Sequence, residues 1–288
     1  MSPTVTVIAA GSMGAGVGRR LADNGVTVRT SLAGRSAESA RRAGAANMMD
    51  CPDEELANAD FVLSIVPPGD ALTLAQRLAP HLARAACKPI YVDCNAVKPH
   101  TVQRIAATVA ATATPFVDGG IIGGPPVPGA KGPAIYVSGN EAKRVEPLAA
   151  SGLDIRVMDG SIGAASALKM SYAGITKGLT ALAAMMLLAA CRQGTAADVR
   201  AELAASQPEL VAWLTRQVPK MFPKAYRWVA EMEEIAGFVG EDPCANKAFH
   251  AFAELYERLA RDDAGERRET GALAALLAHE VERARATA

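Results

Sequence analysis

A glycine-rich turn between an apolar segment and an amphipathic segment restricts the fold of this 288-residue chain more than any other feature. Residues 5–10 are apolar and β-branched, as in a buried strand, and residues 13–24 have the apolar spacing of a helix. Gly11 and Gly14 stand between them. A strand that passes through glycines into a helix lets the backbone and the helix N-terminus approach a pyrophosphate. The turn therefore predicts a dinucleotide site at the start of the chain.

The residues expected to hold the pyrophosphate are Ala9, Gly11, Ser12, Met13 and Gly14. Gly11 would let the backbone approach the phosphates, and Gly14 would let the helix pack closely on the strand. Ala9 takes the place of the first glycine of the G-x-G-x-x-G pattern, so the match is incomplete. The alternative is a tight strand–helix turn without a ligand.

Glycine and proline are unevenly distributed and divide the chain. Of 25 glycines, 18 lie at or before Gly163, as do 13 of 17 prolines, and the remainder is rich in alanine. Strands are expected at 5–10, 26–32, 61–66, 90–94 and 115–118, with later candidates at 134–138 and 155–158, alternating with helices at 13–24, 36–44, 70–85 and 99–111. Helices alone are expected at 162–191, 196–205, 208–218, 223–239, 243–261 and 271–286. The α/β pattern predicts a mostly parallel Rossmann domain over residues 1–160 and an all-helical domain over 161–288.

Composition excludes several classes of function. Thirty basic and 30 acidic residues give zero net charge, which argues against nucleic-acid binding. The apolar run 178–191 is shorter than the roughly 20 residues of a membrane span, so a buried core helix and no membrane association are expected. The N-terminus lacks the pattern of a signal peptide, and five cysteines without a CxxC pair indicate no disulfide framework, so we expect a cytoplasmic protein. The four histidines lack metal-ligand spacing, and no metal is expected (81, 100, 250 and 279).

The segment after the second expected strand bears on the choice between NAD and NADP. An acidic residue there would bind the ribose 2′-hydroxyl, but none occurs before Glu38. Arg35 and Ser36 offer a guanidinium and a hydroxyl that suit a 2′-phosphate, with Arg41 and Arg42 nearby. The alternatives are a solvated arginine and a helix N-cap serine. The sequence favours NADP over NAD.

Five motifs in chain order carry a family resemblance. They are the turn at 9–14, the loop of Val66, Pro67 and Pro68, and the segments 93–95, 118–124 and 163–169. The chain resembles the β-hydroxyacid dehydrogenase and 6-phosphogluconate dehydrogenase superfamily over nearly its whole length. Residues 167–178 and 227–235 resemble the sequences of a branch of this superfamily that has a DUF1932-type C-terminal domain. The resemblance implies an oxidoreductase whose cofactor ribose lies beside the Val66–Pro68 loop.

The resemblance also implies an acid–base residue. Lys169 matches the lysine that opens the interdomain helix, and Asn95 occupies the place of a small polar residue near nicotinamide and substrate. A lysine in an apolar helix beside the cofactor is desolvated, so its pKa is expected to fall toward the working pH. The alternatives are a lysine that extends to solvent and an asparagine that forms a turn.

The substrate-anchoring segment departs from the family pattern. Ile122 replaces the usual serine, while Gly123 and Gly124 offer amides that can hold a carboxylate. Ala173 replaces the asparagine four residues after the lysine, and Tyr172 is a candidate for a compensating hydroxyl or for a packing contact. These changes leave the usual substrates of the family in question.

The expected function is hydride transfer between NADP and a small hydroxy acid or its carbonyl counterpart. The alternatives are an imine reductase on the same scaffold and a non-catalytic NADP-binding sensor. The apolar helical domain indicates a homodimer. In that domain Glu231, Glu233 and Glu234 are interpreted as a solvated helix face.

Overall fold

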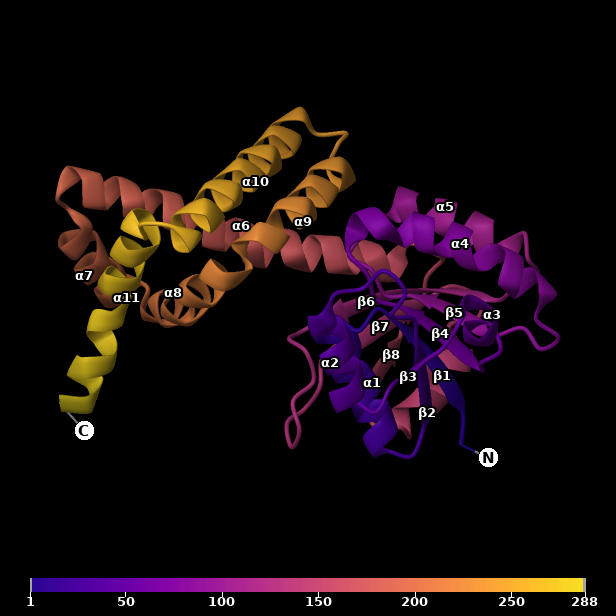
Figure 1. The fold of residues 1–288 in the computed structure, drawn as a ribbon. Coiled ribbons are helices and arrows are strands. Elements are labelled where there is room, and N and C mark those ends of the chain that lie inside the picture. The colour runs from indigo at the N-terminus through magenta and orange to yellow at the C-terminus, as the bar shows by residue number, and fades with distance from the viewer. Residues whose placement is uncertain (1, 287–288) are drawn as a thin grey trace. The chain divides into compact units, whose positions relative to one another are not determined.

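The computed structural model describes residues 2–286, with side chains as far as residue 278. It contains two compact units, Met1–Met170 and Ser171–Ala288. The first unit is an α/β domain and the second is helical throughout its described residues (Figure 1). The expected fold class, a Rossmann domain followed by a helical domain, is confirmed.

One eight-stranded sheet forms the centre of the first unit, in the order β3-β2-β1-β4-β5-β6-β7-β8. Its strands are β1 (Thr4–Ile8), β2 (Thr27–Thr30), β3 (Met49–Asp50), β4 (Phe61–Ser64), β5 (Ile90–Asp93), β6 (Phe116–Ile122), β7 (Ala134–Ser138) and β8 (Asp154–Val157). Every neighbouring pair is parallel except β6 and β7. The carboxyl ends of β1, β4, β5 and β6 therefore share one edge, which is where ligands bind in such sheets.

Helices cover both faces of this sheet. They are α1 (Ser12–Asp23), α2 (Ala37–Ala45), α3 (Asp53–Leu56), α4 (Ala71–Arg84) and α5 (Pro99–Ala110), with 3₁₀ turns η1 (Pro68–Asp70) and η2 (Ala142–Ala149). Alternate residues of β1 enter different cores, because Val7 packs with Leu21 of α1 and Ile8 packs with Leu78 of α4. Burial on both faces explains why the central strands are mostly apolar in sequence.

The fifth expected strand is longer than predicted. It was expected to end at Asp118, with a glycine loop following, but β6 continues to Ile122. Glycine occupies positions 119 and 120 of this strand because neighbouring backbone approaches closely. An ideal Cβ on Gly119 would lie 2.9 Å from the carbonyl oxygen of Asp93, and one on Gly120 would lie 2.7 Å from that of Ala165. Glycine inside a strand commonly marks such a close approach.

The helices from residue 164 onward begin with α6 (Ala164–Gln193), whose first seven residues belong to the first unit. The others are α7 (Ala196–Ser206), α8 (Pro208–Met221), the 3₁₀ turn η3 (Phe222–Lys224), α9 (Ala225–Phe238), α10 (Pro243–Ala264) and α11 (Arg268–Ala286). The helix expected over 223–239 is thus divided, because Pro223 lies in η3 and α9 starts at Ala225.

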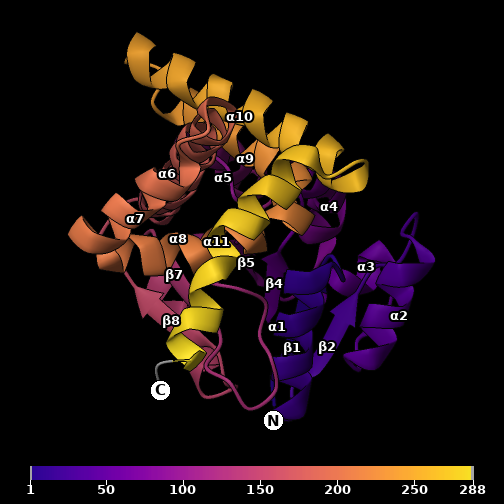
Figure 2. The same cartoon turned by 90° about the vertical axis from the view of Figure 1, so that its left-hand side faces the viewer.

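The second unit is held together by close helix packing. α9 and α10 form an antiparallel pair (Figure 1), and α11 runs beside α8 (Figure 2). Gly174 and Gly178 of α6 lie against Phe249 and Phe252 of α10, where an ideal Cβ would already be in tight contact at 3.3 and 3.4 Å. By length and mean hydropathy, 1.6 over its most apolar window, α6 could cross a membrane, and 44% of that window is buried. A buried core helix gives the same pattern.

Candidate active site

The glycine turn has the geometry of an anion site. α1 begins at Ser12 with Gly11 as its N-cap, and no side-chain hydrogen bond caps it. An ideal Cβ on Gly11 would have no protein atom within 4 Å, whereas one on Gly14 would lie 1.9 Å from the carbonyl oxygen of Ala9. Packing inside the protein therefore requires glycine at 14 but not at 11. The open space beside Gly11 and the uncapped amides of the first turn fit a cofactor pyrophosphate.

The loop after β4 is fixed from a neighbouring strand. The backbone N–H of Val66 donates to Oδ1 of Asn95 at 2.7 Å. Pro67 is exposed and Pro68 starts η1, which leads into α4. This hydrogen bond sets the position of the loop expected to lie beside the cofactor.

The Asn95 amide is already engaged with the protein. The side chain is 2% exposed, and its Nδ2 donates to Oγ of Ser64 at 2.8 Å and to Oδ2 of Asp93 at 3.0 Å. Both amide hydrogens are thus used. A hydrogen bond donated by this amide to nicotinamide or substrate would require one of these bonds to break, whereas its oxygen, which accepts from Val66, can accept a second donor.

Asn95 is hydrogen-bonded to two members of a buried row of polar side chains that crosses four strands. Ser64, Asp93, Asp118 and Ser138 are in register on β4, β5, β6 and β7, and all four are fully buried. Burial raises the pKa of Asp93 to about 7, although hydrogen bonds from Asn95 oppose the rise and the charge of Asp118 adds to it. We call these four residues the polar row. Sequence reasoning missed it because its members lie far apart along the chain.

The row reaches the start of α6 through Asp118. Its Oδ2 accepts hydrogen bonds from the backbone N–H groups of Gly163 and Ser166 at 2.9 and 3.0 Å, and its Oδ1 accepts from the Ser166 hydroxyl at 2.6 Å. The Ser138 hydroxyl donates to Asp118 and accepts from the N–H of Ala165. The first turn of α6 is therefore anchored to β6 and β7.

Lys169 is half-buried, six residues into α6. An ideal Cβ on Gly120 would lie 3.2 Å from the Cβ of Lys169, so the base of the lysine side chain packs directly against β6. Beyond Gly120, the strand ends at Ile122. The next residue, Gly123, has φ +130°, a conformation that favours glycine. The structure thus places Lys169 against the strand that ends in the substrate-anchoring segment of the sequence prediction.

Two other expected substrate-site residues are exposed. Gly124 lies in the loop after β6. Tyr172 is 49% exposed and belongs to the second unit. Neither residue is enclosed by packing within the described part of the chain.

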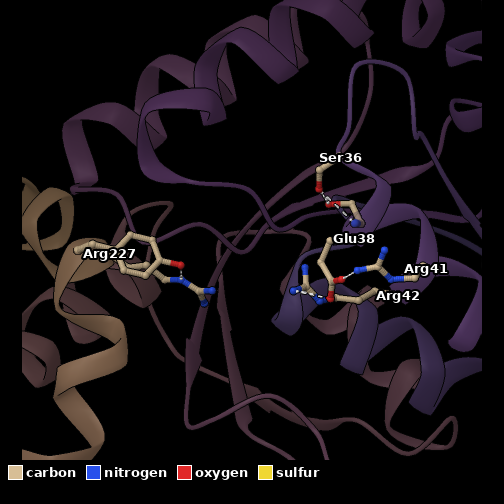
Figure 3. A network of polar contacts seen from close by, with 7 residues as sticks. Ser36, Glu38, Arg41, Arg42 and Arg227 are labelled. Carbon is tan, nitrogen blue, oxygen red and sulfur yellow. Dashed lines mark hydrogen bonds and ion pairs between the residues drawn. The ribbon is translucent and has the colours of Figure 1, made fainter. Parts of the chain in front are cut away.

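The expected 2′-phosphate region differs from the prediction in its charges. Glu38 forms ion pairs with both Arg41 and Arg42 on the surface of α2 (Figure 3), so these arginines are not a free positive cluster. Within the described residues, the Arg35 guanidinium makes no hydrogen bond or ion pair. Ser36 acts as the N-cap of α2, where its Oγ accepts from the N–H of Ser39 at 3.2 Å.

A carboxylate from the neighbouring strand stands near the end of β2. Asp50, the last residue of β3, accepts the backbone N–H of Leu32 at 2.8 Å through Oδ1. This acid does not belong to β2 or its loop but comes from the adjacent strand β3, which pairs with β2. It brings a negative charge to the region predicted to prefer a 2′-phosphate.

The interpretation of Glu231 as part of a solvated face is wrong. Its side chain is 19% exposed and forms an ion pair with Lys177 of α6, whose Nζ lies 4.9 Å from the centroid of the Trp228 ring. Burial lowers the pKa of Lys177 and the charge of Glu231 opposes this. Because α9 turns Glu231 toward α6 within the second unit, the two charges compensate each other.

Neighbouring side chains of α9 do face solvent. Glu233 is half exposed and lies 2.9 Å from Nδ1 of His250. Arg227, also drawn in Figure 3, donates to the Tyr226 hydroxyl at 2.8 Å. Among the side chains as far as residue 278, no group of His, Cys, Asp and Glu gathers as metal ligands would, and His279 lies outside them.

The sheet, the glycine turn and the strand–helix arrangement define a Rossmann domain of the NAD(P)-binding type. Residues 4–150 match the family described as the NAD binding domain of 6-phosphogluconate dehydrogenase, and residues 190–259 match a domain of unknown function, DUF1932. The chain belongs to this superfamily of β-hydroxyacid and 6-phosphogluconate dehydrogenases, in the branch with a DUF1932 domain. The expected family is confirmed.

Individual relatives agree with this assignment. An uncharacterised 28.5 kDa protein of Methanothermus fervidus is 32% identical over 160 residues, which are 54% of this chain and 59% of that protein, so the match spans less than two thirds of the relative. A conserved protein of unknown function, whose structure is similar to 3-hydroxyacid dehydrogenases, is 30% identical with a TM-score of 0.69 over 90% of this chain and 98% of its own.

Two enzymes share the fold at lower identity. Mycobacterium tuberculosis 3-hydroxyisobutyrate dehydrogenase with L-serine has a TM-score of 0.71 at 19% identity, over 92% of this chain and 96% of its own. A Streptomyces aurantiacus imine reductase has a TM-score of 0.57 at 18% identity, over 89% and 95% of the two chains.

Proposed function

We propose that this protein is an NADP-dependent oxidoreductase that transfers hydride between nicotinamide and a small hydroxy acid or its carbonyl counterpart, with Lys169 as the general acid–base. The observation that carries the proposal is the contact of Lys169 with β6. Its Cβ lies against Gly120, two residues before the segment Ile122–Gly124 that would hold the substrate. Cofactor binding alone requires no lysine at this point.

The residues of the glycine turn would hold the cofactor. The amides of Ser12, Met13 and Gly14 would bind the pyrophosphate, and Val66, Pro67 and Pro68 would flank the ribose. The bound nicotinamide supplies the hydride acceptor or donor. The half-buried Lys169 amine accepts the proton of a substrate hydroxyl during oxidation and returns it to the forming alkoxide during reduction. General acid–base groups contribute about 10²–10⁴-fold to rate.

The substrate side of the site has no serine hydroxyl on β6. Ile122 stands at the strand end, and the amides of Gly123 and Gly124 remain for a carboxylate. Tyr172 is exposed and supplies a hydroxyl on the same helix as Lys169. This combination favours a 3-hydroxy acid with an apolar substituent over a highly polar one.

The preference for NADP rests on Arg35. Its guanidinium is available for a 2′-phosphate, whereas Arg41 and Arg42 are paired with Glu38. Asp50 opposes the preference by its charge. We expect tighter binding of NADP than of NAD, with Arg35 as the main determinant.

The test combines cofactor binding with turnover. Purified protein is titrated with NADPH and NADH by fluorescence, and a panel of 3-hydroxy acids, including 3-hydroxyisobutyrate and aryl-bearing acids, is assayed with NADP and NAD. Lys169→Ala should bind NADPH within twofold of wild type and lose turnover by about 10²–10⁴-fold. Lys143→Ala, an exposed lysine of η2, is the control. An alanine variant at 169 with full activity excludes Lys169 as the acid–base.

Two other functions give different outcomes in the same assays. Imine reduction, favoured by the likeness of fold to imine reductases, would give turnover of cyclic imines and none of hydroxy acids. A non-catalytic sensor would bind NADPH and turn over neither class. The close contact of Lys169 with Gly120 favours catalysis over sensing.

A homodimer through the helical unit completes the proposal. α6 exposes three large apolar side chains at spacings of seven and four residues, which keeps them on one helix face: Ile175, Leu182 and Met186, at 49–71% exposure. The same face of a second copy would cover them. Light scattering should give twice the chain mass, and Leu182→Glu should give the monomer, whereas Val199→Glu on α7 should not. We expect this dimer in the cytoplasm, without nucleic acid or membrane as a partner.

A further inference from the structure

We propose that Asp118 is the positioning residue for Lys169: its buried carboxylate fixes the first turn of α6 on the sheet and thereby the point from which the lysine reaches the substrate. This inference rests on the proposed function of Lys169. Asp118 itself touches neither substrate nor cofactor in this scheme.

The first turn of α6 lacks a cap of its own. The first N–H groups of a helix have no partners within it, and a Ser, Thr, Asp or Asn just before the helix usually accepts them. Gly163 stands there instead, with φ +105° and no side chain. Asp118, 45 residues earlier in the chain, accepts the N–H groups of Gly163 and Ser166, and Ser138 accepts that of Ala165. The sheet therefore provides the cap.

The same strand controls the rotation of the helix. Asp118 and Gly120 are two residues apart on β6, so they face the same side of the sheet. Asp118 holds the helix at Ser166, and Gly120 lies against Ala165 and Lys169. Three residues, a rise of about 4.5 Å, separate Ser166 from Lys169 along the helix. Together these two contacts fix both the height of α6 above the strand and the direction in which Lys169 leaves it.

The hydroxyl of Ser166 strengthens the arrangement. It donates to Oδ1 of Asp118 at 2.6 Å, so both carboxylate oxygens are bonded to the same turn of α6. Asp118 and Ser166 are fully buried. A buried carboxylate is tolerated when several donors surround it, and here four are present: two N–H groups and the hydroxyls of Ser138 and Ser166.

The experiment compares Asp118→Ala with Asp118→Asn. Backbone hydrogen exchange over residues 163–170 is measured by mass spectrometry, NADPH binding by fluorescence, and kcat with the 3-hydroxy acid that wild type oxidises. In Asp118→Ala we expect exchange in 163–170 to accelerate at least tenfold relative to β1, kcat to fall about 100-fold, and the NADPH Kd to stay within twofold. An asparagine oxygen can still accept the two N–H groups, so Asp118→Asn should regain at least tenfold in kcat.

A role in stability alone would give a different result. Exchange would then rise over the whole first unit, NADPH binding would weaken along with kcat, and asparagine would give no selective recovery. Any of these outcomes overturns the proposal, as does a kcat within threefold of wild type in a folded Asp118→Ala protein.

Ser166→Ala decides the question if Asp118→Ala does not fold. It removes only the hydroxyl bond to Asp118, and we expect a three- to tenfold loss of kcat with faster exchange in 163–170. Ser206→Ala is the matched control, because that hydroxyl bonds only to a carbonyl of its own helix. Equal behaviour of the two serine variants refutes the proposal. If wild type turns over no panel substrate, the proposed function fails, while the exchange data still decide whether Asp118 anchors α6.

Discussion

Two regions of the same sheet, the polar groups of β5 and β6 and the end of β2, are built in opposite ways. At β5 and β6 the polar groups are buried, bonded to one another and joined to the helix that carries Lys169. At the end of β2 the charges are exposed and paired along the surface of α2, with Arg35 left for a ligand. A buried bonded network resists change, whereas solvated side chains are replaced at little cost. Under the proposed function, the difference implies that the reaction is fixed more firmly than the choice between NAD and NADP.

The largest effect is expected from filling the gap between β6 and α6. Gly120→Ala places a Cβ 2.7 Å from the backbone oxygen of Ala165, which a side-chain movement cannot relieve. We expect the free energy of unfolding to fall by about 1–3 kcal/mol. The shift of Lys169 should also lower kcat by about 100-fold.

Urea unfolding and steady-state kinetics measure these two effects. Gly44→Ala is the control, because an added Cβ there meets no atom within 4 Å and lies in a helix. It should raise stability by up to about 1 kcal/mol. If both glycine variants behave alike, the packing of α6 on β6 does not position the lysine.

A second effect, on stability alone, should follow from Asp93 as pH changes. Burial raises its pKa in the folded protein to about 7, above that of the unfolded chain, so the folded state holds a proton that the unfolded state releases. The associated stability is fully present below about pH 4 and is lost as pH rises through about 7, by an amount on the order of a few kcal/mol.

Asp93→Asn removes this titration while keeping the side-chain size. Wild type should therefore lose stability relative to the variant between pH 5 and pH 8, as measured by urea midpoints at constant ionic strength. A constant difference over that range would show that the Asp93 carboxyl has an ordinary pKa.

The smallest effect is expected at the end of β2. Arg35→Ala should raise the Kd for NADPH by about tenfold, which corresponds to about 1.4 kcal/mol, and leave NADH binding unchanged. Arg41→Ala, whose guanidinium is paired with Glu38, should change either Kd by less than twofold. Equal losses for the two variants, measured by fluorescence titration, would assign the phosphate contact to the whole of α2 instead of to Arg35.

The sequence was sufficient for the features that depend on local spacing. The glycine turn, the alternation of strands and helices, and the all-helical second half follow from periodicity and turn residues. The extension of β6 through Gly119 and Gly120 did not follow, because glycines in a strand look the same in sequence as glycines in a loop. Only the approach of Ala165 explains them.

The features that sequence reasoning missed depend on register between distant strands. The polar row joins residues 64 to 138 because β4, β5, β6 and β7 align them. Asp50 reaches the end of β2 for the same reason, through the pairing of β3. Glu231 was misinterpreted because its partner, Lys177, is 54 residues away. A local pattern cannot specify such pairs.

The boundary between the two compact units has a consequence for how such a protein can evolve. The first unit runs through Met170 and therefore contains the glycine turn, the polar row, the Asp118 cap and Lys169. The second unit can be exchanged or rebuilt in a lineage without removing any of these groups. Under the proposed function, inheritance of the first unit preserves the reaction, and divergence of the second unit changes which substrates undergo that reaction.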